Sequence, residues 1–209
     1  MQIMNKNLKN IENRGYTIIE TMIAVSLFVI IVLMGTNALL NANLVHQKSQ
    51  DGRTVLDSIG FAMNELSRNL RTAYTYHCFV VGEDEILPSP LSALNYPKSC
   101  DLGYGISFET DTGNPSDFND QEIYYLSEGG LWKLAGPYGG TPLPTRLTPE
   151  DVELDIDLSG FSVFGAEAPG GGDQEQPFVT IRLSGEIKFK DVATSFSLQT
   201  SVSQRLIDI

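Results

Sequence analysis

The carboxylate of Glu20 is the only formally charged side chain between Tyr16 and Val45. Inserting a carboxylate at the hydrocarbon level of a membrane costs about 2.5 to 3.5 kcal/mol, so such a group usually has a function and a partner. The alternative is that Glu20 lies at the membrane interface, where headgroups and water solvate it. Residues 1–14 are polar, with three basic side chains and one acidic one. This flank favours a specific function for Glu20 over simple solvation.

Cys78 and Cys100 are the second candidate pair. The basic N-terminal residues predict a cytoplasmic N-terminus and an exported remainder, where the cysteines meet an oxidising space. A disulfide closing a loop of about 23 residues contributes roughly 3 kcal/mol. The alternative is two unrelated small core residues, because sequence does not set their Cα separation. With only His77 beside them, a zinc site lacks ligands, and we expect no metal or cofactor.

Four acidic residues stand close together in one loop and raise the question of calcium: Asp111, Asp117, Asp120 and Glu122. Their spacing does not fit the Asp-x-Asp-x-Asp-Gly pattern of an EF-hand. Clustered carboxylates in a loop are usually solvated, so we assign no metal ligand among them.

Catalytic chemistry has few candidate residues. His46 and His77 are the only histidines, and no Gly-x-Ser-x-Gly elbow presents a nucleophile. Trp132, Tyr124 and Tyr125 could anchor a partner, but aromatic residues in a hairpin are more often core. We expect a protein that is not an enzyme.

Composition limits the partners. The 209 residues carry a formal net charge of −12, which argues against a nucleic-acid surface because phosphate contacts need clustered Lys and Arg. The length suits one globular domain plus a membrane segment.

The elements that position Glu20 are helical. The apolar run Ile18 to Leu40 is long enough to cross a bilayer, and no cleavage site typical of a secretory signal follows it. Apolar residues then recur at spacings of three and four, which predicts an amphipathic helix: Val55, Ile59, Met63, Leu66 and Leu70. We therefore divide the chain into a leader (1–15), an apolar helix (16–45), its amphipathic continuation (46–75) and a β-rich domain (76–209).

The remaining sequence predicts strands with turn residues between them. The predicted strands are Phe79 to Val81, Tyr104 to Glu109, Ile123 to Leu126, Leu131 to Leu134, Val152 to Leu158, Val179 to Phe189 and Phe196 to Val202. Ser-Glu-Gly-Gly between the third and fourth predicts a hairpin. The fold class is α+β, with the amphipathic half of the long N-terminal helix covering an antiparallel sheet.

The N-terminal segment resembles the processing motif of type IV prepilins and type II secretion pseudopilins. It consists of a basic leader, the residues Arg14-Gly15-Tyr16-Thr17-Ile18-Ile19-Glu20 and the apolar run that follows them. The resemblance covers roughly the first 40 residues and implies a type IV pilin-like fold. It implies that prepilin peptidase cuts between Gly15 and Tyr16 and methylates the new N-terminus. Tyr16 stands where Phe is usual, and Ile18-Ile19 where Leu-Ile is common.

The resemblance also implies a partner for Glu20, namely the N-terminal ammonium of a neighbouring subunit. Two later segments resemble J-type minor pseudopilins and similar minor pilins. They are the hairpin from Tyr-Tyr-Leu to Leu-Trp-Lys-Leu and the segment Leu-Gln-Thr-Ser-Val-Ser-Gln-Arg near the C-terminus. Retention of Glu20 argues against the K type, which typically lacks this acid.

The implied function is that of a minor subunit at or near the tip of a pilus or pseudopilus, where it aids initiation. The implied partners are prepilin peptidase, other minor and major pilins or pseudopilins, the inner-membrane assembly platform and membrane lipid, with no direct nucleic acid. The implied location is the inner membrane, with a cytoplasmic N-terminus and an extracytoplasmic domain. The alternative is an adhesin or binding module tethered by a pilin-like anchor. Secretion, pilus and DNA-uptake machines all remain open.

Overall fold

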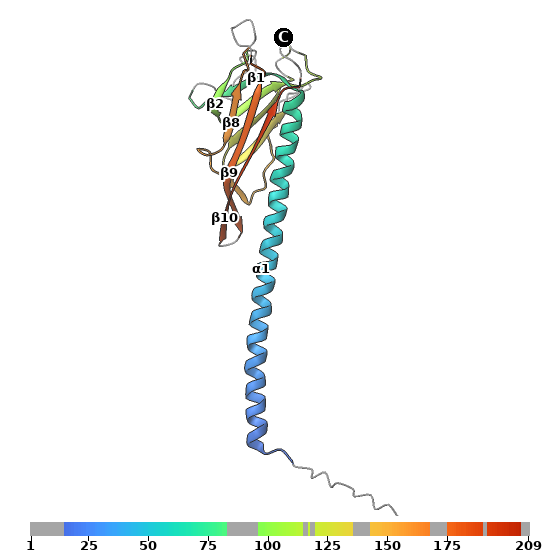
Figure 1. Cartoon of the computed structure of the whole chain (residues 1–209), viewed down its shortest axis with the longest axis vertical. Helices are drawn as coiled ribbons and strands as arrows, with labels where there is room; N and C mark the ends of the chain where they lie inside the picture. Colours follow the sequence, from blue (N-terminus) through green and yellow to red (C-terminus); the bar gives the residue numbers. More distant parts are fainter. Residues whose placement is uncertain are drawn as a thin grey trace, which may run out of the picture. The chain divides into compact units, whose positions relative to one another are not determined.

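A computed structural model describes residues 15–82, 96–114, 117, 120–135, 143–167, 175–189 and 192–205 of the chain. The predicted leader, apart from Gly15, lies outside these residues. The chain forms two compact units, residues 1–49 and residues 50–209. Helix α1 (Ile18–Thr72) belongs to both units (Figure 1).

In the first unit α1 is the only described helix long and apolar enough to cross a membrane. Its large apolar side chains from Ile18 to Val45 are exposed. Hydroxyl groups within this stretch bond the preceding turn of the same helix: Thr21 donates to Ile18 O at 2.8 Å and Thr36 to Val32 O at 2.8 Å. Their donors are thus satisfied without water, as a nonaqueous environment requires.

The second unit contains two five-stranded sheets whose strand pairs are antiparallel (Figure 1). The first has the order β1 (Tyr74–Phe79), β3 (Gly105–Glu109), β4 (Glu122–Ser127), β5 (Gly130–Ala135), β6 (Thr145–Arg146). The second has the order β10 (Val192–Ser203), β9 (Phe178–Phe189), β8 (Gly160–Phe164), β2 (Cys100–Gly103), and β7 (Val152–Leu154) also pairs with β9. With the long helix, this α+β arrangement confirms the predicted fold class and is consistent with a pilin-like fold.

The amphipathic stripe of α1 forms the centre of the core. Its buried residues are Val55, Ile59, Ala62, Met63, Leu66 and Leu70, which pack in one cluster with apolar side chains from both sheets. The predicted apolar stripe is therefore confirmed. Burying such a face is what stabilises an amphipathic helix against a sheet.

The predicted hairpin joins β4 and β5 through a two-residue turn. Glu128 and Gly129 both have positive φ, 48° and 66°, which is the geometry of a type I′ turn. The register pairs Ser127 with Gly130 and Tyr124 with Lys133.

Several predicted boundaries are wrong. The first strand runs from Tyr74 to Phe79, not from Phe79 to Val81, and α1 ends at Thr72, three residues before the predicted end. The strand predicted over Val152 to Leu158 ends at Leu154. Asp155 Oδ1 accepts the N–H groups of Asp157 and Leu158, and this local bonding turns the chain away from the sheet. The alternation of apolar and polar residues also failed to predict β2 and β8.

Candidate functional site

The N-terminal motif lies at the start of α1. Thr17 caps the helix, because its hydroxyl accepts the N–H of Glu20 at 3.3 Å and its carbonyl accepts the N–H of Thr21 at 3.2 Å. Thr17-Ile18-Ile19-Glu20 therefore has the Thr-x-x-Glu spacing of a capping box. Glu20 lies in the first turn, where the positive end of the helix dipole favours a carboxylate by about 0.3 to 1 kcal/mol.

Gly15 and Tyr16 precede the helix and are exposed. A Cβ built on Gly15 would meet no atom within 4 Å. The structure thus brings Gly15, Tyr16 and Glu20 into one exposed segment, and the fold itself imposes no requirement for glycine at position 15.

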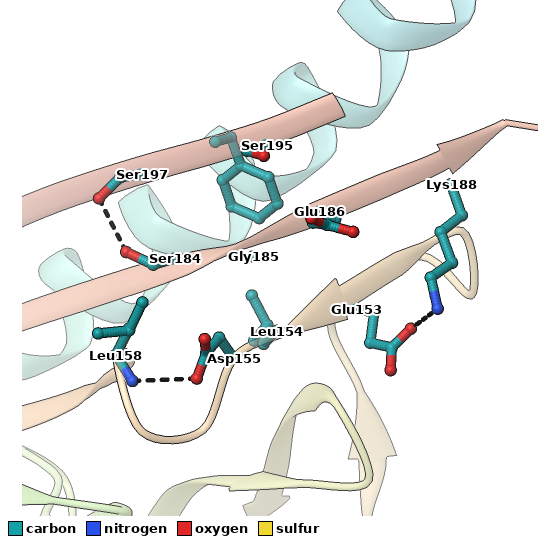
Figure 2. Close-up of a pocket in the computed structure, with 11 residues that line it drawn as sticks. Glu153, Leu154, Asp155, Leu158, Ser184, Gly185, Glu186, Lys188, Ser195 and Ser197 are labelled. Carbon is teal, nitrogen blue, oxygen red and sulfur yellow. Dashed lines mark hydrogen bonds and ion pairs between the residues drawn. The ribbon is translucent and has the colours of Figure 1, made fainter. Parts of the chain in front are cut away.

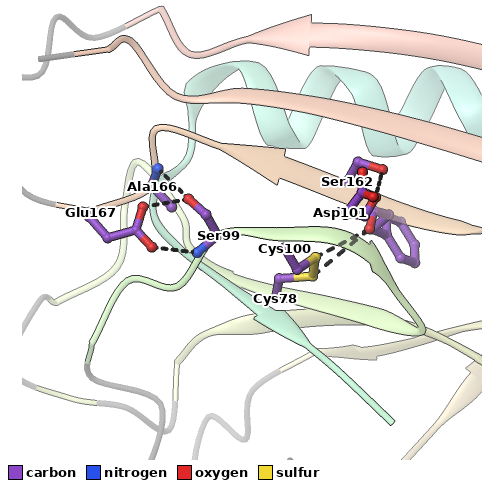
Figure 3. Close-up of a disulfide and its surroundings, with 8 residues drawn as sticks. Cys78, Ser99, Cys100, Asp101, Ser162, Ala166 and Glu167 are labelled. Carbon is purple, nitrogen blue, oxygen red and sulfur yellow. Dashed lines mark hydrogen bonds between the residues drawn. A yellow bond between two sulfur atoms is a disulfide. The ribbon is translucent and has the colours of Figure 1, made fainter. Parts of the chain in front are cut away.

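Cys78 of β1 and Cys100 of β2 form a disulfide with a Cα separation of 5.9 Å (Figure 3). Because β1 belongs to the first sheet and β2 to the second, this bond links the two sheets. Cys78 N also donates to Lys98 O at 3.0 Å, and Lys98 N to Tyr76 O at 3.0 Å. A Cβ on Gly103 would overlap the Cys78 sulfur, so glycine is required beside the bond. Of the two alternatives for the cysteines, the structure contains the disulfide.

A carboxylate clasp lies next to the disulfide (Figure 3). Ser99 N donates to Glu167 Oε1 at 2.8 Å, the Ser99 hydroxyl donates to Glu167 Oε2, and Ala166 N donates to Ser99 Oγ at 3.1 Å. Burial opposes ionisation, but the hydrogen bonds from Ser99 lower the pKa of Glu167 below its usual value. The clasp holds the segment after β8 against the residue that precedes Cys100.

A charged network joins the amphipathic half of α1 to the first sheet. Lys133 Nζ lies 3.1 Å from Glu65 Oε1 and 3.2 Å from Glu122 Oε2, and 5.3 Å from the centroid of the Tyr124 ring. Asn69 donates to the Tyr124 hydroxyl at 2.8 Å. Burial raises the pKa of Tyr124 to about 12, although the hydrogen bond to Lys133 opposes the shift. Tyr124 is fully buried, so it belongs to the core rather than to an exposed anchor.

A groove of about 610 Å³ lies between β7, the turn that follows it, and the β9–β10 hairpin (Figure 2). A Cβ on Gly185 would overlap the carbonyl of Glu153, so glycine allows β7 to approach β9. Leu158 and the half-buried Phe196 form apolar walls, and Lys188 pairs with Glu153 at the rim. The lining residues are Glu153, Leu154, Asp155, Leu158, Ser184, Gly185, Glu186, Lys188, Ser195, Phe196 and Ser197. The carboxylate, hydroxyl and apolar groups that line this groove suit the binding of a ligand. None of the lining residues is a histidine that could act as a general base.

The other residues considered for chemistry are dispersed. His77 is fully buried, with Nδ1 2.9 Å from Tyr96 O, whereas His46 is exposed on α1. Among the four acidic loop residues, Asp111 and Asp117 are exposed, and Glu122 turns to Lys133. In the described part of the chain, no three His, Cys, Asp or Glu side chains gather in a group that could hold a metal.

Comparisons with known protein families, with curated proteins and with solved structures found no match to this chain. Sequence reasoning missed the Thr17 cap, although the Thr-x-x-Glu spacing signals it. It also missed the link between Lys133 and Glu65, for which no local pattern exists because 68 positions separate the two residues.

Proposed function

We propose that this chain is a minor pilin or minor pseudopilin. Prepilin peptidase cuts it between Gly15 and Tyr16, and the mature chain enters a type IV pilus-like or type II secretion filament, at or near the tip, where it aids initiation. One observation carries the proposal. The motif from Arg14 to Glu20 leads into an apolar helix that begins at Ile18, whose side chains are exposed and whose first turn holds Glu20.

The apolar helix supports insertion in a membrane and later packing among other helices. Exposed apolar surface of this extent needs a nonaqueous environment, because each buried CH₂ contributes about 0.8 kcal/mol. In this proposal residues 1–15 are cytoplasmic, the helix first anchors the precursor in the inner membrane, and residues 76–209 are extracytoplasmic. The disulfide between Cys78 and Cys100 fits an oxidising compartment.

Gly15 supports the processing step. A side chain at this position meets nothing in the fold, so the motif's glycine has no structural explanation within the described chain. A protease that binds extended backbone at the membrane face supplies one, because glycine places no side chain against the enzyme.

Mass spectrometry of the mature N-terminus in the native host tests the proposal. We expect a chain that begins at Tyr16 with a methylated amine. Gly15→Leu should remain uncut, while Gly35→Ala, a second open glycine on the apolar helix, should be processed normally. An N-terminus at Met1 in the wild-type protein would remove the basis of the proposal.

In this proposal, the partners are prepilin peptidase, the other minor and major subunits, the assembly platform and membrane lipid. Deletion of the chain should abolish or sharply reduce filaments. The groove between β7 and the β9–β10 hairpin favours the second candidate, a tethered adhesin or binding module, because it could hold an exported ligand. Intact filaments with lost attachment or uptake would identify the second candidate.

A further inference from the structure

The groove between β7 and the β9–β10 hairpin is formed by the fold itself. Strands β7 and β8 both pair with β9, and residues 155–159 between them turn away from it. Ser184 of β9 holds both ends of this turn, because its carbonyl accepts the N–H of Asp155 at 2.9 Å and the hydroxyl of Ser159 at 2.9 Å. Asp155 Oδ1 also accepts the N–H of Leu158 at 3.3 Å. The groove therefore has fixed walls, and its volume of about 610 Å³ suits a ligand site.

Apolar side chains line part of this groove. Leu158 is 55 % exposed, although its backbone is fixed by the turn. Phe196 is half-buried and lines the same groove. Single exposed apolar residues are common on protein surfaces, but Leu158 lies in a concave site, where a ligand side chain can cover it from water. This part of the groove suits an aliphatic side chain.

The charged lining residues leave the groove negative. Glu153, Asp155 and Glu186 supply three carboxylates, whereas Lys188 supplies the one ammonium among the described lining residues and pairs with Glu153. Among the described ion pairs, none joins Asp155 or Glu186. The strand register places Glu186 directly opposite Glu153, and like charges at opposed positions destabilise a sheet. A cationic ligand would reduce this repulsion, so charge complementarity favours a basic partner.

We propose that the groove binds an extended peptide segment in which a Lys or Arg stands two positions from an aliphatic residue. Figure 2 shows Leu158 and Ser184 at one end of the groove and Lys188 at the other. Ser184 and Glu186 point to the same face of β9, about 7 Å apart. An extended ligand repeats this spacing, because its side chains i and i+2 also share a face. Its cation lies at Glu186 and its aliphatic side chain at Leu158.

The partner is a segment of an exported protein. This inference names the ligand class of the groove that favours the second candidate function, and it rests on that proposal in placing residues 76–209 outside the cytoplasm. Nucleic acid does not fit, because the groove's carboxylates repel phosphates. A neighbouring subunit in the groove would make filament formation depend on the same side chains.

Fluorescence anisotropy with the full chain in detergent and a labelled peptide that repeats Lys-Ser-Leu-Ser tests the site. The dissociation constant is expected at about 10⁻⁵ to 10⁻⁴ M, because the groove is open and a flexible peptide loses conformational freedom on binding. Raising NaCl from about 0.05 to 0.5 M should weaken binding at least fivefold by screening the charges. A Lys-Leu-Ser-Ser repeat has the same composition with the wrong spacing, and should bind at least about fivefold more weakly. A Glu-Ser-Leu-Ser repeat should not bind.

Glu186→Gln and Leu158→Ser should each weaken binding of the Lys-Ser-Leu-Ser peptide by at least about fivefold. Both side chains are exposed, so both variants should fold. Asp111→Asn and Leu143→Ser are the matched controls, because they remove an exposed acid and an exposed leucine that do not line the groove. Both controls should keep the wild-type affinity within about twofold.

Absence of peptide binding at about 1 mM would overturn the site, and so would unchanged affinity in Glu186→Gln. In the native host, Glu186→Gln should keep its filaments and lose attachment or uptake. Loss of filaments in this variant would overturn the assignment to an exported protein and identify a neighbouring subunit instead. Mass spectrometry of the N-terminus reports on processing at Gly15 separately, so failure of this site and failure of the pilin proposal are distinguishable.

Discussion

The ammonium of Lys133 on β5 lies 3.1 Å from the carboxylate of Glu65 on α1, and both side chains are mostly buried. Their side chains are 18 % and 32 % exposed, whereas the other described ion pair remote from this network, Lys188 with Glu153, is 58 % exposed on both sides. Burial decides which of these pairs matters, since exposed pairs contribute about 0 to 1 kcal/mol and breaking a buried one costs several times more.

Lys133→Met should therefore lower the free energy of unfolding by about 1 to 3 kcal/mol, because it removes the ammonium that pairs with both Glu65 and Glu122. Chemical denaturation measures this change. Lys188→Met is the matched control and should change stability by less than about 0.5 kcal/mol. Equal effects of the two substitutions would contradict a structural role for the network.

Removing the disulfide with Cys78→Ser and Cys100→Ser together should cost about 3 kcal/mol, because the unfolded chain regains the entropy of a loop with a sequence separation of 22. Reductant should destabilise the wild-type protein by a similar amount. The same reductant should leave the double variant unchanged, and an equal response of both proteins would show that the bond does not form.

Glu20→Ala should leave the chain in the membrane and cleaved, yet reduce its incorporation into filaments at least tenfold. A neighbour's ammonium would lose its partner, and a charge that is costly alone would no longer specify the axial register. Immunoblotting of sheared filaments against the membrane fraction measures this ratio. Ser26→Ala is the control, because the Ser26 hydroxyl bonds the carbonyl of Ile23 in its own helical turn. This variant should be incorporated as the wild-type chain is.

Glu20→Gln separates charge pairing from helix capping. Glutamine serves at the fourth position of a capping box as glutamate does, but it carries no charge. Normal incorporation of Glu20→Gln would assign Glu20 to the cap that begins at Thr17 and would refute the pairing role.

Stability should fall as pH rises from about 4.5 to 7, because of Glu109. The pKa of Glu109 is about 7 in the folded state against an ordinary value of 4.5, so the folded protein holds a proton that the unfolded chain releases. The associated stabilisation is fully present below pH 4.5 and is lost as pH rises through 7, by an amount on the order of 3 kcal/mol. Chemical denaturation at several pH values measures this change, and Glu109→Gln should flatten the profile.

Three features were predictable because neighbouring residues encode each of them. They are the α+β class, the apolar stripe from Val55 to Leu70 and the hairpin at Glu128-Gly129. Prediction was poorer where a local polar contact competed with alternation. Asp155 ends β7 by bonding its own turn, so Ile156 and Leu158 are exposed despite their apolar pattern. Alternation of apolar and polar residues indicates which face of a strand each side chain occupies. It does not indicate where the backbone leaves the sheet.

The exposed N-terminal segment with Gly15, Tyr16 and Glu20 follows from sequence alone, since contiguous residues at a helix start need no tertiary contact to lie together. Sequence also named Cys78 and Cys100, but only the packing of β1 beside β2 brings their Cα atoms to 5.9 Å. The partnership of Lys133 with Glu65 and the meeting of Glu109 with Gln121 likewise depend on strand register and on the face that α1 turns to the sheet. Those contacts join residues distant along the chain, and their geometry exists only once the two sheets and the helix have packed.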